Sequence, residues 1–350
     1  MADTALVEKP VRTYRDYGRP LWRRVLLTHP MAVIAALVLV YLVAAITVKG
    51  FAGPLTFQYL LPDLVAILLI ALPMTLVIIT GEIDLSVAST AALAGGVFGV
   101  ANQAGVPTAL AALLGLATGV LAGAVNGFFI TVVGLPSLAV TIGTLALFRG
   151  VAQGIIGNAG AGDFPEELRD AVLSRIPGTP IPSALVVVAL LAVIFGVVLH
   201  LTPVGRGIFA IGLSSEAARF SGVGIERTKF ALFTISGTVA GLAGMYYALR
   251  TGVALPDNTA GLELSVIAAV LLGGVSIFGG RGTLVGVIAG VLLIGVLSRA
   301  LILAKFGSDV VSIVTGGLLV ISVLTTSFLA WIRRRRTRPG GKKGSPRPAE

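Results

Sequence analysis

The sequence contains no cysteine and only two histidines, His29 and His200. A chain without cysteine forms no disulfide and offers no thiolate to a metal ion. Two histidines cannot build a typical zinc site, and they leave no suitable base for serine-histidine-aspartate chemistry. The sequence also lacks a phosphate-binding loop of the GxxxxGKS or GxxxxGKT type. We therefore expect no bound metal or cofactor and no ATP hydrolysis by this chain alone.

Charged residues are also scarce. They make up 12% of the 350 residues, against about 25% in a soluble domain. Apolar residues make up 56%, and 45 residues are glycine, which lets membrane helices approach closely. A soluble core of this size would need a charged surface that the composition does not supply. The composition therefore predicts an all-α integral membrane protein.

Stretches without charge indicate about ten transmembrane helices, since a bilayer core of about 30 Å needs about 20 apolar residues per helix. Residues 25–48 form the first span and residues 64–81 form most of the second. The charge-free stretch 85–148 is long enough for three, separated by residues 102–107 and 133–136. The other five predicted spans are residues 181–202, 230–249, 262–279, 283–304 and 310–332.

The positions of the basic residues predict that both ends of the chain lie in the cytoplasm. With ten spans, most of the 26 lysine and arginine residues fall on the inner side, as the positive-inside rule requires. Residues 1–29 then form a basic cytoplasmic leader and residues 30–332 the transmembrane domain. Residues 333–350 form a disordered basic cytoplasmic tail on anionic lipid. This topology accounts for the net charge of +10, so the bilayer is the expected partner and nucleic acid is not.

The largest polar stretch between apolar spans is residues 203–229. Ser214 or Ser215 could cap a short helix whose first turn contains Glu216, where the positive helix end favours a carboxylate. Gly222 then ends the helix. A short capped helix between two spans is a rigid element that a partner on the inner face could push.

Two carboxylates, Glu82 and Asp84, lie in the polar segment 81–86 between two apolar runs. Charges at membrane depth are costly and often functional. The segment is either a polar turn in which Asp84 caps the next helix or a gate or coupling element. The predicted topology places it near the inner membrane face, where such charges could stay solvated.

Further polar residues interrupt the apolar spans. They could form hydrogen bonds between helices or line a hydrophilic path. Glu263 and Asp63 could each face an outer vestibule or the headgroups, and we expect Arg299 to snorkel or to pair inward. The candidate residues of a path or gate are Glu82, Asp84, Ser86, Asn126, Thr141, Thr144, Arg149 and Glu263.

In combination, four segments resemble one protein family. Glu216-Ala217-Ala218 followed by Gly222 resembles the EAA-type cytoplasmic loop of ABC importer permeases. Residues 81–86 are similar to the GGIDLS segment of one branch, the monosaccharide permeases of ribose, xylose, rhamnose and autoinducer-2 type, although Glu82 replaces a glycine. Residues 126–150 and 263–282 resemble two further runs of that branch. The resemblance covers about residues 30–330.

The resemblance implies a permease subunit, not an enzyme, of an ATP-driven importer in the bacterial inner membrane. The cargo would be a small sugar or sugar-like molecule such as rhamnose, ribose or autoinducer 2. The implied partners are ATPase subunits that bind ATP and Mg²⁺, a second permease, identical or paralogous, and an extracytoplasmic sugar-binding protein. The implied ATPase-coupling residues are Ser215, Glu216, Ala217, Ala218, Arg219 and Gly222.

An ion-coupled secondary transporter of a small polar solute is the alternative. Such a transporter would need a proton or sodium relay at the membrane midplane, and the sequence offers no clear carboxylate cluster there.

Overall fold

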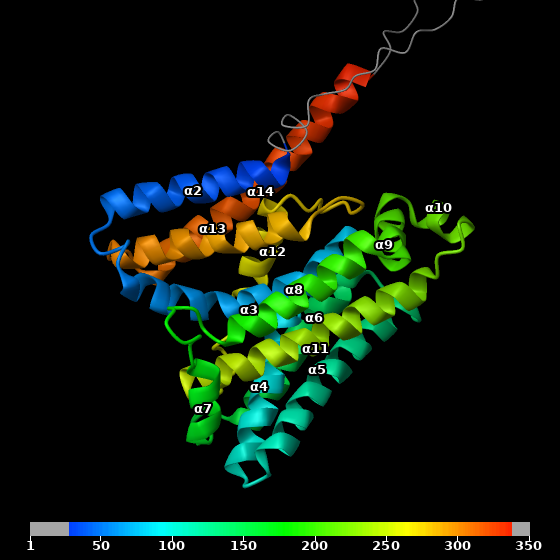
Figure 1. Ribbon diagram of the computed structural model, residues 1–350. Helices are drawn as coiled ribbons and strands as arrows, with labels where there is room; N and C mark the ends of the chain where they lie inside the picture. The colour runs from blue at the N-terminus through cyan, green and yellow to red at the C-terminus, as the bar shows by residue number, and fades with distance from the viewer. Residues whose placement is uncertain (1–27, 338–350) are drawn as a thin grey trace, which may run out of the picture.

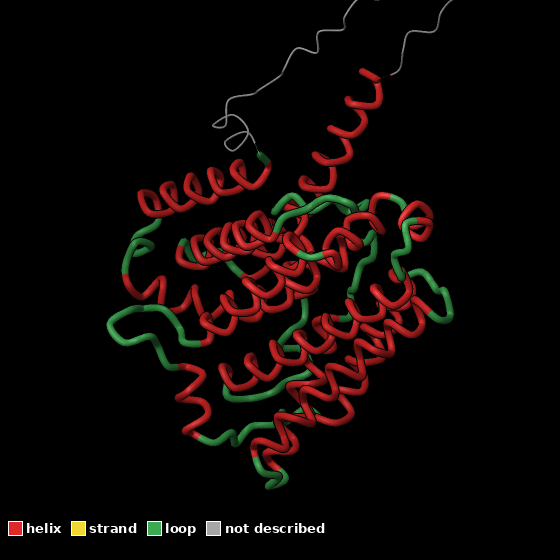
Figure 2. Tube along the Cα trace, turned by 45° about the vertical axis from the view of Figure 1, so that its right-hand side comes forward, coloured by secondary structure: helices red, strands yellow, loops and turns green. Residues whose placement is uncertain are grey.

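The computed structural model describes residues 28–337, and every regular element in this range is an α-helix (Figure 1; Figure 2). Most of the predicted leader 1–29 and residues 338–350 of the predicted tail lie outside the described residues. The last helix continues to Thr337, beyond the predicted boundary at residue 332.

Each predicted span corresponds to one helix of the structure. These helices are α2 (His29–Thr47), α3 (Pro54–Ile79), α4 (Val87–Gln103), α5 (Thr108–Thr131), α6 (Ser137–Ile156), α8 (Ala184–Leu201), α11 (Ile225–Thr251), α12 (Leu262–Leu272), α13 (Leu284–Leu303) and α14 (Ser308–Thr337). Within the described residues, seven helices are long and apolar enough to cross a membrane: α2, α3, α5, α6, α8, α11 and α13. The chain therefore has the character of a multi-pass membrane protein, while ten spans and the orientation of the termini stay predictions.

Two of the predicted boundaries change. The eighth predicted span, 262–279, contains a helix of only 11 residues, because α12 ends at Leu272 and a glycine turn follows. The polar stretch 203–229, where the sequence predicts one short helix, contains α9 (Pro203–Leu213) as well as the predicted α10 (Ser215–Phe220), and it ends at the start of α11. One more short helix, α7 (Glu166–Leu173), lies between α6 and α8.

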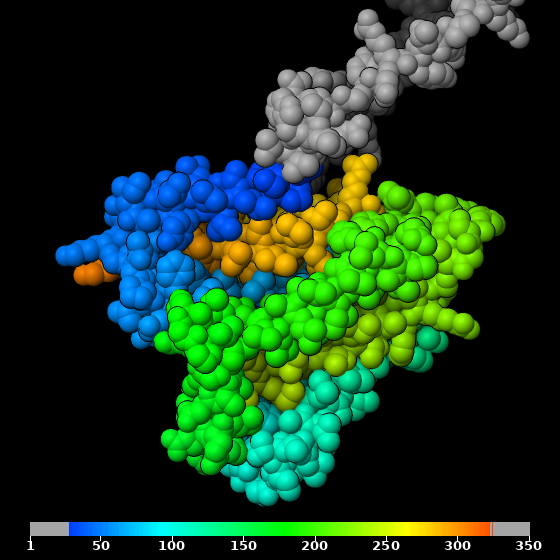
Figure 3. All heavy atoms as spheres, in the orientation of Figure 1, coloured from blue at the N-terminus to red at the C-terminus, as the bar shows by residue number. Residues whose placement is uncertain are grey.

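Helix α3 forms the centre of the molecule. It is apolar on all sides, and an all-apolar helix of this kind is buried rather than amphipathic. Residues 68–79 are all buried, and the main hydrophobic cluster gathers around them. By contrast, α2 and α8 expose apolar side chains such as Leu39 and Val193 over the outer surface (Figure 3). This distribution suits a protein whose surroundings are lipid.

Glycines bring α4 and α5 into backbone contact with α11. A Cβ added at Gly95 of α4 would lie 2.7 Å from the carbonyl oxygen of Gly244 on α11, and one added at Gly237 would overlap Gly119 of α5. We call these four residues the glycine seam. Because small residues let membrane helices pack at close range, the seam fixes the positions of the three helices that surround the site described next.

Candidate functional site

The predicted short capped helix exists as α10. The Ser214 side chain is its N-cap and accepts a hydrogen bond from the backbone N–H of Ala217 at 3.3 Å. Glu216 lies in the first turn, and Gly222 follows the helix with φ +80°. This left-handed conformation favours glycine. The capping residues and the end of the helix are as the sequence predicts.

One face of α10 is anchored and the other is free. Ala218 is buried against Ile211 of α9 and Ile225 of α11. It therefore holds α10 against these two helices and does not face a partner. Ser215, Glu216, Ala217 and Arg219 are exposed, and Arg219 also forms a surface ion pair with Glu226. Phe220 at the end of α10 is 86% exposed. The sequence analysis missed this aromatic residue, although an apolar residue in a polar stretch was the available signal.

The end of α9, directly before α10, touches the end of α3 through backbone atoms. A Cβ added at Gly212 would overlap the carbonyl oxygen of Ile79 and the backbone nitrogen of Gly280. The N–H of Gly280, which precedes α13, donates a hydrogen bond of 2.8 Å to the same carbonyl. We call Ile79, Gly212 and Gly280 the glycine junction. Without side chains between them, α9 and the buried helix α3 are in direct backbone contact.

Residues 80–86, which we call the polar turn, connect α3 to α4 and contain a buried carboxylate. Asp84 is 1% exposed. Its Oδ1 accepts hydrogen bonds from the backbone N–H of Ser86 at 2.9 Å and from the Ser86 hydroxyl at 2.7 Å. The Ser236 hydroxyl on α11 donates to Oδ2 at 3.5 Å. The expectation of a solvated charge at the membrane edge is wrong for Asp84, because packed helices surround it and protein groups replace water as its partners.

Two neighbouring helices also bond to the polar turn. The Asn126 amide on α5 donates to the Ser86 hydroxyl at 2.7 Å. On α6, the Ser137 hydroxyl accepts from the N–H of Ile83, and Thr141 donates to the Ile83 carbonyl, both at 3.3 Å. The structure therefore brings Asp84, Ser86, Asn126 and Thr141 together, with the interhelical hydrogen bonds that the sequence analysis considered.

Glu82 ties the polar turn to the first turn of α11. Its Oε1 forms an ion pair with Lys229 Nζ, and the two side chains are 17% and 18% exposed. An ion pair with this little exposure is screened by solvent much less than a surface pair. Lys229 belongs to the polar stretch 203–229, so the pair connects two segments that the sequence analysis treated separately.

Three of the predicted residues do not join this network. Thr144 donates only to carbonyls of its own helix. Arg149 lies about 18 Å from Ser137 along α6, at 1.5 Å per residue, and its buried Nε and Nη2 have no hydrogen-bond partner among the described residues. Glu263 begins α12, and its buried Oε2 likewise has no partner there.

The fold and the site define a class of protein: a polytopic membrane protein whose buried polar turn is joined mechanically to a small exposed helix. The family described as branched-chain amino acid transport system / permease component matches residues 56–323. The chain belongs to this family of permeases, and the resemblance to ABC importer permeases of the monosaccharide type is confirmed.

Curated relatives cover most of the chain. The autoinducer 2 import system permease protein LsrD of Photorhabdus luminescens is 37% identical over 287 residues, which are 78% of this chain and 86% of the relative. The protein of the same name from Photorhabdus laumondii is 36% identical over 313 residues, covering 84% and 93%. That of Yersinia pseudotuberculosis is 36% identical over 289 residues, covering 79% and 86%. No solved structure matches the chain.

Proposed function

We propose that this chain is the membrane-spanning permease subunit of an ATP-driven importer for a small sugar or sugar-like molecule, with autoinducer 2 as the leading candidate and rhamnose and ribose as others. The names of the relatives support the cargo class. The observation that carries the proposal is that both helices next to α10 contact the centre of the bundle. Helix α9 touches the end of α3 at the glycine junction, and α11 is joined to the polar turn by the Glu82–Lys229 pair. A push on α10 would reach the centre of the bundle as a rigid-body movement.

The ATPase subunits, which bind ATP and Mg²⁺, would dock on the free face of α10. Its exposed residues, Ser215, Glu216, Ala217 and Arg219, offer polar contacts, and Phe220 offers an aromatic anchor of the kind that dominates interface energetics. Gly222 would allow the chain to reverse direction directly after the docked helix. The chain itself would bind no nucleotide.

Two further partners complete the proposed importer in the bacterial inner membrane. A second permease, identical or paralogous, would pair with this one. A soluble sugar-binding protein would dock at the end of the molecule far from α10. There α7 presents Glu166, Glu167 and Asp170, and α8 runs from that end back to α9.

The test is uptake by proteoliposomes that contain the permease, its ATPase and its binding protein, with autoinducer 2 as the probe. Glu216→Lys reverses a charge on the docking face, so we expect ATP-driven uptake to fall at least about tenfold, a loss of about 1.4 kcal/mol of productive coupling. Membrane insertion should be unchanged. Asp309→Lys is the matched control, because Asp309 is also an exposed carboxylate in the first turn of a helix.

Normal uptake by Glu216→Lys would contradict the role of α10. Uptake that follows a proton or sodium gradient without ATP would replace the importer proposal with the ion-coupled alternative.

A further inference from the structure

A second polar site lies at the opposite end of the bundle, in a cavity of about 470 Å³ between α3, α12, α13 and α14. We call this cavity the distal pocket. Its lining mixes charged and hydroxyl groups with aliphatic side chains. The polar members that matter here are Asp63, Tyr247, Ser298, Arg299 and Thr315.

The position of the distal pocket follows from the glycine junction. The end of α3 and the turn before α13 both touch α9 there, so the start of α3 and the end of α13 lie far from α10. Asp63 lies in the first half of α3, and Arg299 is near the end of α13. Asp63 is about 24 Å from Ile79 along the axis of α3, at 1.5 Å per residue. If α10 faces the ATPase, this pocket lies on the side from which cargo arrives.

Two charged groups in the distal pocket keep free hydrogen-bonding capacity. The guanidinium carbon of Arg299 lies 5.0 Å from the centre of the Tyr59 ring. Arg299 lines the cavity, and its Nε is buried without a hydrogen-bond partner among the described residues. An unmet buried donor is costly, so the guanidinium gains when it turns a nitrogen toward a ligand or water in the cavity. Asp63 forms an ion pair with Arg250 through Oδ1, but its side chain is still 47% exposed. One wall therefore offers donors and another offers an acceptor.

The remaining walls are aliphatic. They include Leu60, Leu64 and Ile67 of α3 and Ile294 and Ile302 of α13. A sugar-like ring has an apolar face of C–H groups and an edge of hydroxyls that both donate and accept. Sites that bind small molecules combine a mainly apolar lining with a few placed polar groups in this way. The lining therefore fits a small neutral polyhydroxylated ring.

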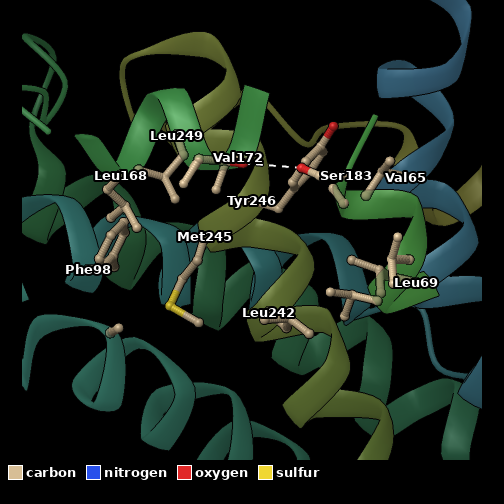
Figure 4. Close-up of a pocket in the computed structure, with 15 residues that line it drawn as sticks. Val65, Leu69, Phe98, Leu168, Val172, Ser183, Leu242, Met245, Tyr246 and Leu249 are labelled. Atoms are coloured by element: carbon tan, nitrogen blue, oxygen red, sulfur yellow. Dashed lines mark hydrogen bonds between the residues drawn. The ribbon is translucent and has the colours of Figure 1, made fainter. Parts of the chain in front are cut away.

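A larger cavity of about 660 Å³ between α3, α4, α7, α8 and α11 does not fit such a ligand (Figure 4). Its lining is almost wholly hydrocarbon. The hydroxyls of Ser183 and Tyr246 are the exceptions, and both already donate within the protein, to Ala171 O at 3.1 Å and to Pro62 O at 3.0 Å. A polyol placed there would lose its hydrogen bonds to water without replacement.

We propose that the distal pocket binds the small, neutral, polyhydroxylated ring molecule that the importer carries, before the molecule reaches the polar turn. The proposal rests on the proposed function, since it assigns a site to the same cargo. Arg299 and Ser298 donate to the hydroxyl edge, Asp63 accepts from it, and the aliphatic walls cover the ring face.

The absence of cysteine makes a direct test possible, because every introduced thiol is unique. Ser298→Cys and Thr315→Cys place a thiol in the distal pocket, and Ser308→Cys places one at the exposed start of the same helix as Thr315, outside the pocket lining. The permease in proteoliposomes is treated with a membrane-impermeant methanethiosulfonate reagent, with and without autoinducer 2 or D-ribose as the probe. At a probe concentration of about ten times Kd, mass action should slow modification of the two pocket thiols about tenfold. Modification of the Ser308→Cys control should not change.

The outcomes separate this proposal from the proposed function. Unprotected pocket thiols in a permease that still shows ATP-driven uptake of the probe would overturn the pocket and leave the importer intact. Protection without ATP-driven uptake would overturn the importer instead. Pocket thiols that become reactive only after lipid is stripped by detergent, with no effect of either probe, would show that a lipid occupies the pocket and would also overturn the proposal.

A second variant tests the hydrogen-bonding role of Arg299. Arg299→Gln keeps one N–H donor group but removes the charge and the paired donors of the planar guanidinium. Because binding of the cargo would weaken, we expect a higher KM for uptake with little change in kcat. Unchanged KM in a folded Arg299→Gln permease would contradict the assignment.

Discussion

Glu82 and Lys229 lie 147 residues apart in the sequence, and their side chains pair in a largely shielded position. Removing one member of such a pair leaves the other charge without a partner, which costs more than the pair contributes when intact. The pair also joins the polar turn to α11, the helix that follows α10 in the chain. Its loss should therefore weaken the response of the turn to α10 as well as the fold.

We predict that Glu82→Gln and Lys229→Gln each lower ATP-driven uptake about tenfold, which corresponds to about 1.4 kcal/mol. The exchanged double variant, Glu82→Lys with Lys229→Glu, should recover most of the activity, because the pair is restored with reversed sign. Uptake and the amount of folded permease would be measured together for all three variants.

The exposed pair Arg219–Glu226 provides the control for this experiment. Its side chains are 67% and 53% exposed, so Glu226→Gln should change uptake little, as is usual for surface pairs. A double variant no better than the single ones would show that Glu82 and Lys229 act independently.

Sequence reasoning identified Glu82 and Asp84 because charged residues between apolar runs are conspicuous. It did not find their partners. Lys229 counted only as one basic residue among several, and Ser236 and Ser137 are ordinary residues in membrane helices. Pairing across more than a hundred residues depends on tertiary packing, which no local pattern in a single sequence reports. Thr144 and Thr141 look alike as polar residues in one apolar span, but only Thr141 bonds to another segment, while Thr144 bonds within its own helix.

Helix α3 extends from the distal pocket to the polar turn and is buried along most of its length. Pro62 and Pro73 lie inside it, and each removes one backbone hydrogen bond of the helix. Its last residue, Ile79, belongs to the glycine junction. Helix α3 therefore connects the proposed cargo site, the polar turn and the glycine junction, which lies directly before α10.

We predict that Gly212→Ala uncouples ATP hydrolysis from uptake. The added methyl group would overlap Ile79 and Gly280, so α9 must move off α3, and the hydrogen bond from Gly280 to Ile79 must lengthen. ATP hydrolysis by the reconstituted complex should continue while uptake falls at least about fivefold, which corresponds to about 1 kcal/mol, the lower end of typical overpacking costs.

Gly196→Ala on α8 is the matched control, since a Cβ there meets no atom within 4 Å. It should leave both activities near the wild-type values. If the two alanine variants behaved alike, the junction would have no role in coupling.

At the scale of helices, the sequence located α10 well because caps, first-turn acids and terminal glycines are local signals. It did not reveal α9, whose apolar residues are too few to form a span and were included in a loop. The end of α12 was also missed, because residues 273–279 are apolar enough to extend a span while their glycines form a turn.

The whole molecule exposes apolar side chains on α2 and α8, and seven described helices have the length and composition of spans. These features require a bilayer or a second subunit around the chain. They do not reveal which end faces the cytoplasm, because the positive-inside rule depends largely on basic residues in the leader and tail.

We predict that both termini are cytoplasmic. Alkaline phosphatase, which needs an oxidising compartment for its disulfides, should be inactive when fused after Glu350. It should be active when inserted at Gly178, in the loop between α7 and α8. Activity measured in whole cells, relative to the amount of fusion protein, gives the answer. An active fusion at Glu350 would contradict a cytoplasmic C-terminus and would require either an odd number of spans or the reverse orientation of all ten.

The contacts of the polar turn also set a condition on how the protein is made. Ribosomes synthesise the chain from the N-terminus to the C-terminus. Helices α4 and α5 therefore reach the bilayer long before α11 has been synthesised. Until then Asp84 lacks Ser236 and Glu82 lacks Lys229. Polar groups are costly in lipid without their partners. The first half of a nascent permease therefore carries polar groups without their final partners until α11 has been synthesised and has packed against it.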